Sequence, residues 1–413
     1  MRKVTFWLSL ALIFVIPLEN AVFIQGLGRL SKAVGLVVAA LWIATVMITG
    51  KARKPHPFHA VVILFVLWNA LSIFWSVDHD RTMDRAITYT QLFVMVLVIS
   101  DLYATPTALR AGLQAYILGA YIPIGSTIYN YFHASQFYYQ RYAGAGLHVN
   151  DLGLILALGI PVAWYLTLIK DEHGKKSYRL TLINYAYIPA ATLAILLTAS
   201  RGAVIAAMPA FLFIFLSLNR FKLHIRFLLF VMLAGSLLAV LPFVPESSFE
   251  RLAVTDTVIT EGGLNGRSAI WREGFALFIA HPLLGVGSGA FRTAATETGQ
   301  LAHNFVLSLL VEIGIIGFIL YAIILAMAVY YAIHQPKWSC RLWLTVLMVW
   351  TIGAASHNWE HRKQTWLFLS LVPVGASAYV RRDEAGILVT PPDHSANWKR
   401  GSANFLVRDA RVD

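Results

Sequence analysis

Residues 303–333 read HNFVLSLLVEIGIIGFILYAIILAMAVYYAI, an apolar run that contains no lysine, arginine or aspartate and a single glutamate, Glu312. A helix needs about 20 apolar residues to cross a bilayer. This run exceeds that length, so we expect its helix to protrude from the bilayer or to lie tilted within it. The stretch therefore predicts a membrane-spanning helix, and a carboxylate at this depth must face a cavity or a buried cation.

The composition of the whole chain agrees with a membrane protein. Of its 413 residues, 58% are hydrophobic and only 13% are charged, and the mean hydropathy is +0.65. Soluble domains are about 45–50% apolar and about 25% charged. A disordered chain, a collagen and a small disulfide scaffold are excluded. The single cysteine, Cys340, excludes an intramolecular disulfide and a cysteine-cluster metal site.

Eleven further segments have the length and apolarity of membrane spans. We therefore predict an all-α integral membrane protein with about twelve transmembrane helices. The predicted spans are 4–24, 31–50, 58–77, 86–104, 110–132, 151–170, 183–200, 203–219, 226–244, 303–333, 338–357 and 364–380.

The distribution of lysine and arginine predicts the orientation of these spans. With both termini in the cytoplasm, 21 of the 33 cations fall on the cytoplasmic side and 12 on the outer side. An excess of cations inside is the usual topology signal of membrane proteins. The net charge of +12 is thus explained by topology, and nucleic-acid binding is not expected.

The outer cations are mostly arginines. Arginine presents a planar fork of donors that matches phosphate oxygens, so this bias suggests a phosphate-bearing ligand at the outer leaflet. Chance is the competing explanation for so small a set. The ten outer arginines are Arg29, Arg81, Arg85, Arg141, Arg201, Arg251, Arg267, Arg272, Arg292 and Arg362.

Two outer connections are long, namely 133–150 and 245–302. Loops of this length are usually functional or carry structure of their own. We predict one membrane domain, residues 1–382, that includes the large helical loop 245–302. The polar stretch 383–413 is predicted to be a disordered cytoplasmic tail.

Within the large loop, residues 267–280 (RSAIWREGFALFIA) have helical periodicity, with Trp271, Phe275 and Phe278 on one face. Such a helix either lies flat at the interface or roofs a cavity. Arg267 falls in its first turn, where free backbone amides also favour anions. Arg272 follows about 140° further around the helix. The two arginines could flank a diphosphate but not grip one phosphate together.

The glycines of GVGSG, residues 285–289, are interpreted as a turn. A nucleotide-binding loop is not expected, because no strand precedes them and no lysine follows.

His303 lies where the long helix is expected to begin. A histidine at such an interface is most often simply solvated. The positive end of the helix dipole disfavours imidazolium, however, so His303 should be neutral near pH 7. A neutral imidazole can accept a proton from an attacking hydroxyl.

Other outer side chains are candidate ligand contacts. Arg201, in the string TASRG, faces a polar cavity or snorkels to the interface. Arg141 precedes the pair Asn150-Asp151. Arg81, in DHDR, is more simply explained by local ion pairing.

A metal site is not expected. His357 and His361 are four residues apart, but the sequence offers no third convincing ligand.

Three local strings together resemble the O-antigen ligase family, which shares a domain with O-antigen polymerases. They are Ser200-Arg201-Gly202, then Gly266-Arg267-Ser268 and Trp271 running on to 281–287 (HPLLGVG), and finally His303-Asn304 with Leu307. The family's twelve-helix topology, with a large periplasmic loop between the ninth and tenth helices, covers nearly the whole chain.

The resemblance implies a glycosyltransferase of the bacterial inner membrane whose active site faces the periplasm. It would move O-antigen glycan from undecaprenyl diphosphate to the lipid A–core oligosaccharide of lipopolysaccharide, without metal or cofactor. The family residues match His303, Arg201 and Arg267. Arg141, Arg272 and Arg81 are added here from their charge and predicted side.

These residues define an expected mechanism and its rivals. His303 would be the general base, the arginines would hold the diphosphate, and direct displacement would invert the anomeric configuration. An O-antigen polymerase and a twelve-helix transporter are the alternatives. The oligomeric state is left open, with a monomer as the simplest case.

Overall fold

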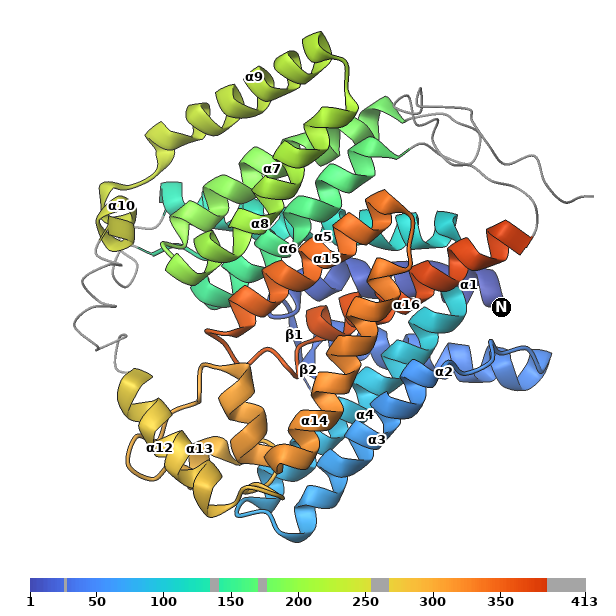
Figure 1. The fold of residues 1–413 in the computed structure, drawn as a ribbon, viewed down its shortest axis with the longest axis vertical. Coiled ribbons are helices and arrows are strands. Elements are labelled where there is room, and N and C mark those ends of the chain that lie inside the picture. The colour runs from blue at the N-terminus through green and yellow to red at the C-terminus, as the bar shows by residue number, and fades with distance from the viewer. Residues whose placement is uncertain (26–27, 134–140, 170–176, 254–266, 385–413) are drawn as a thin grey trace, which may run out of the picture.

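The computed structural model describes residues 1–25, 28–133, 141–169, 177–253 and 267–384, which form a bundle of long helices (Figure 1). The elements in chain order are α1 (Arg2–Val15), η1 (Ile16–Leu18), β1 (Phe23–Ile24), β2 (Gly28–Arg29), α2 (Leu30–Thr49), α3 (Pro57–Leu71), η2 (Ser72–Phe74), α4 (His79–Leu102), α5 (Pro106–His133), α6 (Val149–Leu168), α7 (Tyr178–Leu197), α8 (Arg201–Ser217), η4 (Leu218–Arg220), α9 (Leu223–Val240), η5 (Leu241–Phe243), α10 (Glu246–Ala253), α12 (Arg267–Ala280), α13 (Phe291–Ala294), α14 (Phe305–Ile333), α15 (Lys337–Ala354) and α16 (Lys363–Glu384).

All twelve predicted spans overlap a helix. Eight helical stretches are long and apolar enough to cross a bilayer: Leu30–Thr49, Pro57–Phe74, His79–Leu102, Val149–Leu168, Tyr178–Leu197, Arg201–Arg220, Leu223–Phe243 and Phe305–Ile333. The chain is thus a helical integral membrane protein. The count of twelve spans and the cytoplasmic placement of the termini stay predictions, and residues 385–413 of the predicted tail lie outside the described part of the chain.

α6 is the most enclosed of these helices, with buried residues along nearly its whole length. Small residues let its neighbours approach closely, as where Gly153 lies against Ala203 of α8. Tyrosine hydroxyls bond to its carbonyls: Tyr116 donates to Ile155 at 2.9 Å and Tyr187 donates to Leu156 at 3.2 Å. In membranes such interhelical bonds contribute about 0.6 kcal/mol each. These contacts hold α6 firmly in the bundle, so α6 fixes the positions of the residues at its two ends.

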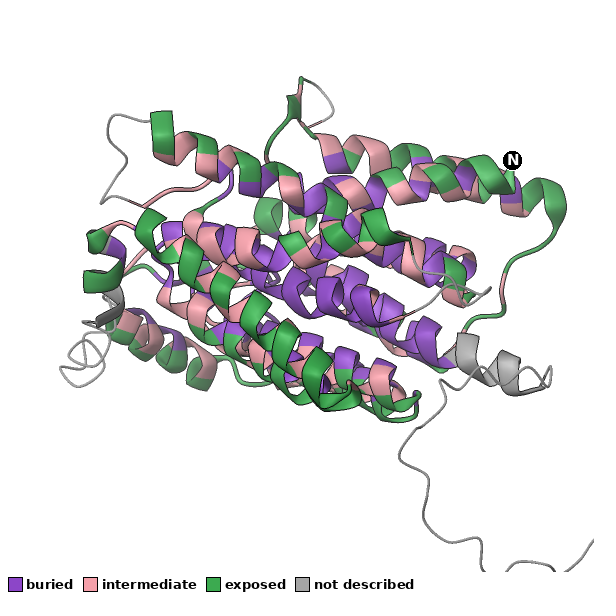
Figure 2. Cartoon of the chain, turned by 90° about the horizontal axis from the view of Figure 1, so that it is seen from above, coloured by how far each residue is buried: buried purple, intermediate pink, exposed green. Residues whose placement is uncertain are grey.

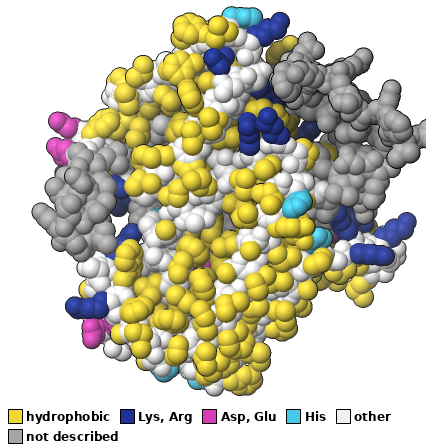
Figure 3. Space-filling model, viewed as in Figure 1, with side chains coloured by type: hydrophobic (Ala, Val, Ile, Leu, Met, Phe, Trp, Pro, Cys, Tyr) yellow, Lys and Arg dark blue, Asp and Glu magenta, His cyan; other side chains and the backbone are white. Residues whose placement is uncertain are grey.

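Apolar side chains also cover the outside of the bundle. α9 has no buried residue, and it packs along α7 at the edge of the molecule (Figure 1). Figure 2 shows exposed positions along the outer helices and buried positions between them. Hydrophobic side chains spread over much of the face in Figure 3. A soluble protein rarely exposes so continuous an apolar surface, whereas lipid tails solvate one at no cost.

The first predicted span is wrong in its second half. α1 ends at Val15 and a short 3-10 turn containing Pro17 follows, because proline lacks the amide that a continuing helix needs. Beyond it, β1 and β2 pair antiparallel, with Phe23 opposite Arg29. This small hairpin is an exception to the all-α prediction.

The long apolar run is not one continuous helix. α14 is interrupted at Gly314, whose φ of 65° and ψ of −172° are not helical. The interruption leaves backbone groups without helical partners, and inside a membrane protein these must be paired. Val286 and Gly287 donate their amides to the carbonyls of Val311 and Glu312, both at 2.9 Å, and the indole of Trp68 donates to Ile313 at 3.0 Å.

Residues 281–287 thus supply hydrogen-bond partners for the backbone groups that the break in α14 leaves unpaired. The Ile315 amide completes the pairing by donating to Pro282 at 2.9 Å. Gly285 and Gly287 both have positive φ, so the predicted turn is confirmed. A small second core forms beside it, made of Ile270, Val286, Ala290, Phe291, Ala295, Ala302 and Val311. The α9–α14 connection is therefore anchored on α14.

Gly314→Ala should destabilise the protein. The left-handed backbone there costs a non-glycine residue about 1–3 kcal/mol, and a Cβ would collide with the carbonyl of Leu283. We expect a lower apparent melting temperature of the detergent-purified protein. Gly235→Ala is the matched control, because nothing lies within 4 Å of a Cβ at that helical position. Equal melting temperatures of the two variants would contradict this account.

Candidate functional site

His303 and Asn304 begin α14, as predicted. Asn304 is the N-cap, and its Oδ1 accepts from the amides of Val306 at 2.9 Å and Leu307 at 3.1 Å. His303 precedes it with a positive φ of 46°, which is uncommon for a non-glycine residue. The half-buried imidazole is therefore set by a strained turn rather than by a regular helix.

Arg201 is the first residue of α8 rather than the last of the preceding helix. The turn before it has Ala199 in the left-handed region, with φ of 47°, and Thr198 Oγ1 accepts from the Ser200 amide at 3.3 Å. The half-buried Arg201 thus lies beside the free amides of a helix N-terminus, where anions are favoured.

Arg141 lies against this same turn. Its Nε donates to the Thr198 carbonyl at 2.9 Å, and its terminal nitrogen donates to Asn150 Oδ1 at 2.7 Å. The amide of Tyr142 donates to Leu197 at 3.0 Å. Arg141 and Tyr142 therefore lie along the α7–α8 junction, against the turn that precedes Arg201.

α12 covers residues 267–280, so the predicted loop helix is confirmed. Its buried side carries Ile270 and Gly274. Phe275 is 56% exposed, and its ring lies beside that of Phe278, with centroids 6.4 Å apart. The indole of Trp271 donates to the Ala302 carbonyl at 2.9 Å. This bond ties the helix that begins with Arg267 to the residue before His303.

The structure brings Arg201, Arg267 and His303 into one electrostatic neighbourhood. Burial and the charge of Arg201 lower the pKa of Arg267. Burial, followed by the charge of Arg267, lowers the pKa of His303 below its usual 6.5. The expected neutral imidazole is thus supported, although the sequence argument assigned the effect to the helix dipole. Arg267 is thus close enough to interact electrostatically with both Arg201 and His303.

Arg81 and Arg272 lie elsewhere. The half-exposed Arg81 pairs with Asp78 at 3.3 Å, and Asp78 also accepts from Thr293 of α13 at 2.6 Å. This is the local ion pairing that the sequence suggested as the simpler role. Arg272 is exposed on α12, on a different side of the helix from Arg267.

The sequence argument missed the N-terminal end of α6. His148 caps this helix, and its Nδ1 accepts from the Asn150 amide at 3.3 Å, which leaves the proton on Nε2. Burial lowers its pKa, against the raising effect of Asp151. A proton on His148 would lower the pKa of His303, so the two rings lie within electrostatic reach of each other. A second neutral imidazole therefore belongs to this neighbourhood.

The linker between α15 and α16, residues 355–362, was also missed except as a rejected metal motif. Arg362 donates to Asp151 at 2.9 Å and to Glu19 at 3.3 Å, and the indole of Trp359 donates to Asp151 at 2.8 Å. Lys363 pairs with Glu19 at 2.8 Å. The string HNWEHRK was the available signal, because five ionisable groups follow a helix end there.

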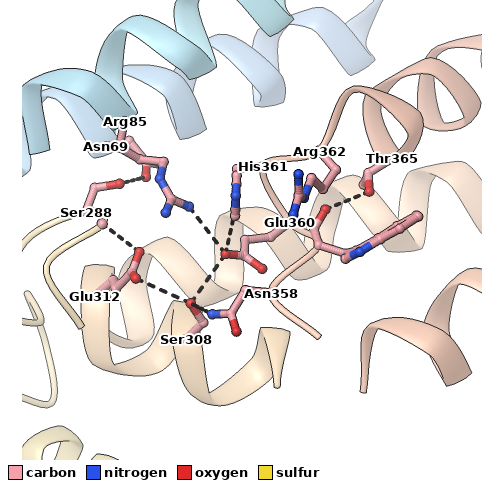
Figure 4. Close-up of polar contacts among 12 residues, drawn as sticks. Asn69, Arg85, Ser288, Ser308, Glu312, Asn358, Glu360, His361, Arg362 and Thr365 are labelled. Carbon is pink, nitrogen blue, oxygen red and sulfur yellow. Dashed lines mark hydrogen bonds and ion pairs between the residues drawn. The ribbon is translucent and has the colours of Figure 1, made fainter. Parts of the chain in front are cut away.

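Residues of this linker belong to a buried polar network (Figure 4). Glu360 is 1% exposed, and its Oε1 lies 3.4 Å from Arg85 and 3.1 Å from His361 Nδ1. Ser308 of α14 donates to Glu360 at 3.3 Å and to Glu312 at 3.4 Å. The network therefore joins α4, α14 and the linker in a site of low dielectric, where such pairs are rigid but costly to break.

Glu312 is placed by the same network. Its Oε2 accepts from the Gly289 amide at 2.7 Å, and the charge of Arg85 acts on it. The carboxylate thus holds the end of the 281–289 turn. Across the described ranges, no group of three or more histidine, cysteine, aspartate or glutamate side chains has the arrangement of a metal site.

Comparison with known proteins relates part of this chain to a family. Residues 186–322 match the family model described as O-Antigen ligase. This part of the chain is similar to an O-antigen ligase domain. A curated relative, the O-antigen ligase of Pseudomonas aeruginosa, is 25% identical over 328 residues, which cover 77% of this chain and 76% of the relative. The resemblance inferred from the sequence is confirmed.

The O-antigen ligase match includes Arg201, Arg267 and His303 but ends before the α15–α16 linker. Arg141 and His148 lie ahead of it. The neighbourhood around His303 is thus assembled from the matched domain and from both flanking parts of the chain.

Asn304→Ala should destabilise the start of α14. Removing an N-cap costs about 1 kcal/mol, within a range of about 0.5–2. We expect a lower apparent melting temperature for Asn304→Ala than for Asn304→Asp, since aspartate keeps the capping oxygen. If both variants melt like the unmodified protein, the cap does not stabilise this turn.

Proposed function

We propose that the protein is a glycosyltransferase that moves O-antigen glycan from undecaprenyl diphosphate to the lipid A–core oligosaccharide, with His303 as general base. One observation carries the proposal: a neutral imidazole lies among guanidinium groups inside an O-antigen ligase domain. The base requires the uncharged imidazole, and the leaving diphosphate requires the cations.

The proposed reaction is a single displacement. A nitrogen of His303 takes the proton from a hydroxyl of the acceptor sugar, and that oxygen attacks the anomeric carbon of the donor sugar. The bond from this carbon to the diphosphate oxygen breaks, and the electron pair leaves with undecaprenyl diphosphate. Attack from the face opposite the leaving group inverts the anomeric configuration. A positioned general base contributes about 10²–10⁴ in rate.

Arg201 and Arg267 are proposed to bind the diphosphate, with Arg141 beside them. The pKa of Arg267 is lowered by burial and then by the charge of Arg201, because like charges repel. An anion relieves that repulsion. A hydrogen bond to a charged group contributes about 1.5–3 kcal/mol, so two arginines can supply several orders of magnitude in rate. Arg272 and Arg81 are proposed only as outer contacts of a larger glycan.

The setting follows from the same proposal. The chain would span the bacterial inner membrane with residues 1–382 as one domain and 383–413 as a cytoplasmic tail. The end that carries α12 would face the periplasm. The lipid tail would enter between helices, and a monomer with neither metal nor cofactor would suffice.

An O-antigen polymerase is the second candidate, because the proposed chemistry at His303 is the same for either acceptor. A transporter is less favoured, since the polar groups converge on α12 and on helix ends instead of lining a path through the bundle.

A transfer assay tests the proposal. Purified protein receives the lipid-linked glycan with or without lipid A–core, and products are resolved by mass. We expect glycan on lipid A–core only when both substrates are present, and none from His303→Ala. His334→Ala is the matched control, because His334 is an exposed histidine at the other end of α14. Longer lipid-linked chains formed without lipid A–core would instead identify a polymerase. Undiminished transfer by His303→Ala would exclude His303 as the base.

The rate should fall at acidic pH. The pKa of His303 lies below its usual 6.5, so its neutral form persists through neutral pH and is lost only as the pH drops further. We expect kcat/KM to be flat near neutrality and to decline below about pH 6.5. A decline that begins above neutral pH would contradict the neutral imidazole.

A further inference from the structure

Buried polar atoms without partners gather in one short segment. Ten side-chain nitrogen or oxygen atoms in the described part of the chain are shielded from solvent and lack a hydrogen-bond partner. Five of them lie in residues 357–364: His357 Nε2, Asn358 Oδ1, Glu360 Oε2, Arg362 Nε and Gln364 Oε1. Leaving such a group unpaired costs about 1–3 kcal/mol. A cluster of them is typical of a functional segment rather than of a packing element.

The tautomer of His357 follows from its contacts. Nδ1 lies 2.8 Å from the Gly353 carbonyl, which can only accept, so Nδ1 carries the proton. Ser356 Oγ lies 2.9 Å from the same nitrogen. Nε2 is then left with a free lone pair. Burial lowers the pKa of His357 to about 4, so Nε2 stays an acceptor at neutral pH.

The ring lies beside the proposed diphosphate site. A Cβ on Gly202 would be 2.9 Å from Ser356 Oγ and 3.9 Å from His357 Cε1, the carbon bonded to Nε2. Gly202 directly follows Arg201 in the first turn of α8. The charges of Asp151 and Arg267 also act on this imidazole.

The chemistry of the surroundings defines what this atom can bind. Guanidinium groups supply hydrogen-bond donors and no acceptors. The hydroxyls of a sugar, by contrast, need acceptors as well as donors. A neutral nitrogen meets that need without repelling a diphosphate, which a carboxylate in the same place would do.

We infer that His357 is a further substrate-binding residue, whose Nε2 accepts a hydrogen bond from a hydroxyl of the donor sugar next to the diphosphate. The inference rests on the proposed function, because it assumes a lipid-linked sugar donor. It assigns the α15–α16 linker, outside the matched family domain, to recognition of the sugar. Binding would pair an atom that the free protein leaves unpaired.

The test compares His357→Phe, which keeps a planar ring but removes the acceptor, with His357→Gln, whose carbonyl can restore it. His334→Phe is the matched control. We expect His357→Phe to raise the KM and the Kd for undecaprenyl-diphosphate-linked glycan about tenfold, the size of one lost hydrogen bond. His357→Gln should recover most of this loss. The KM for lipid A–core and the acidic limb of the pH profile should not change.

Three outcomes would overturn the inference: wild-type donor affinity in His357→Phe, equal losses in the phenylalanine and glutamine variants, or disappearance of the acidic limb, which would make His357 the base.

Melting temperatures show whether each variant folds. If His357→Phe does not fold, His357→Met replaces it, since a flexible apolar side chain also lacks the acceptor. Donor binding without glycan transfer by the unmodified protein would refute the proposed function while the Kd comparison still decides the role of His357.

Discussion

The need to pair every backbone group within a membrane protein governs how this molecule is assembled. α14 breaks at Gly314, and the freed amides and carbonyls are satisfied by the turn at 282–287. That pairing holds the α9–α14 connection against the bundle, and Trp271 then fixes α12 beside the start of α14. The position of Arg267 relative to His303 thus depends on hydrogen bonds that lie several helical turns away from either residue.

The polar residues are held by helix ends. Arg201 begins α8, His148 caps α6 and His303 precedes α14, and each of these turns has an irregular backbone or a side-chain cap. Rigid apolar helices position the turns, and the turns position the polar groups. The buried pair of Glu360 and Arg85 adds a second support, since it joins the α15–α16 linker to α4. The neighbourhood around His303 is thus set by elements distant in sequence.

Much of this could be predicted from the sequence because it depends on local patterns. Apolar runs marked every long helix, and the periodicity of 267–280 gave α12 with its bounds. The strings around Arg201, Arg267 and His303 identified residues that the structure brings together. The break at Gly314 was missed, because a glycine in an apolar run resembles an ordinary helical residue until its partners in 281–287 are known. His148 and His357 were missed for a similar reason. Their surroundings come from tertiary contacts, which no local spacing encodes.

The crowding of guanidinium groups has a consequence for the resting protein. Arg201 and Arg267 repel each other in a partly desolvated place, while the Trp271 indole and the Glu273 carboxylate bond α12 to residues 297–302. An anionic ligand would convert the repulsion into attraction and draw α12 toward α8. Binding of a glycan donor would therefore make this region more rigid. The donor would hold α12, which carries Arg267, and Arg267 would in turn bind the donor.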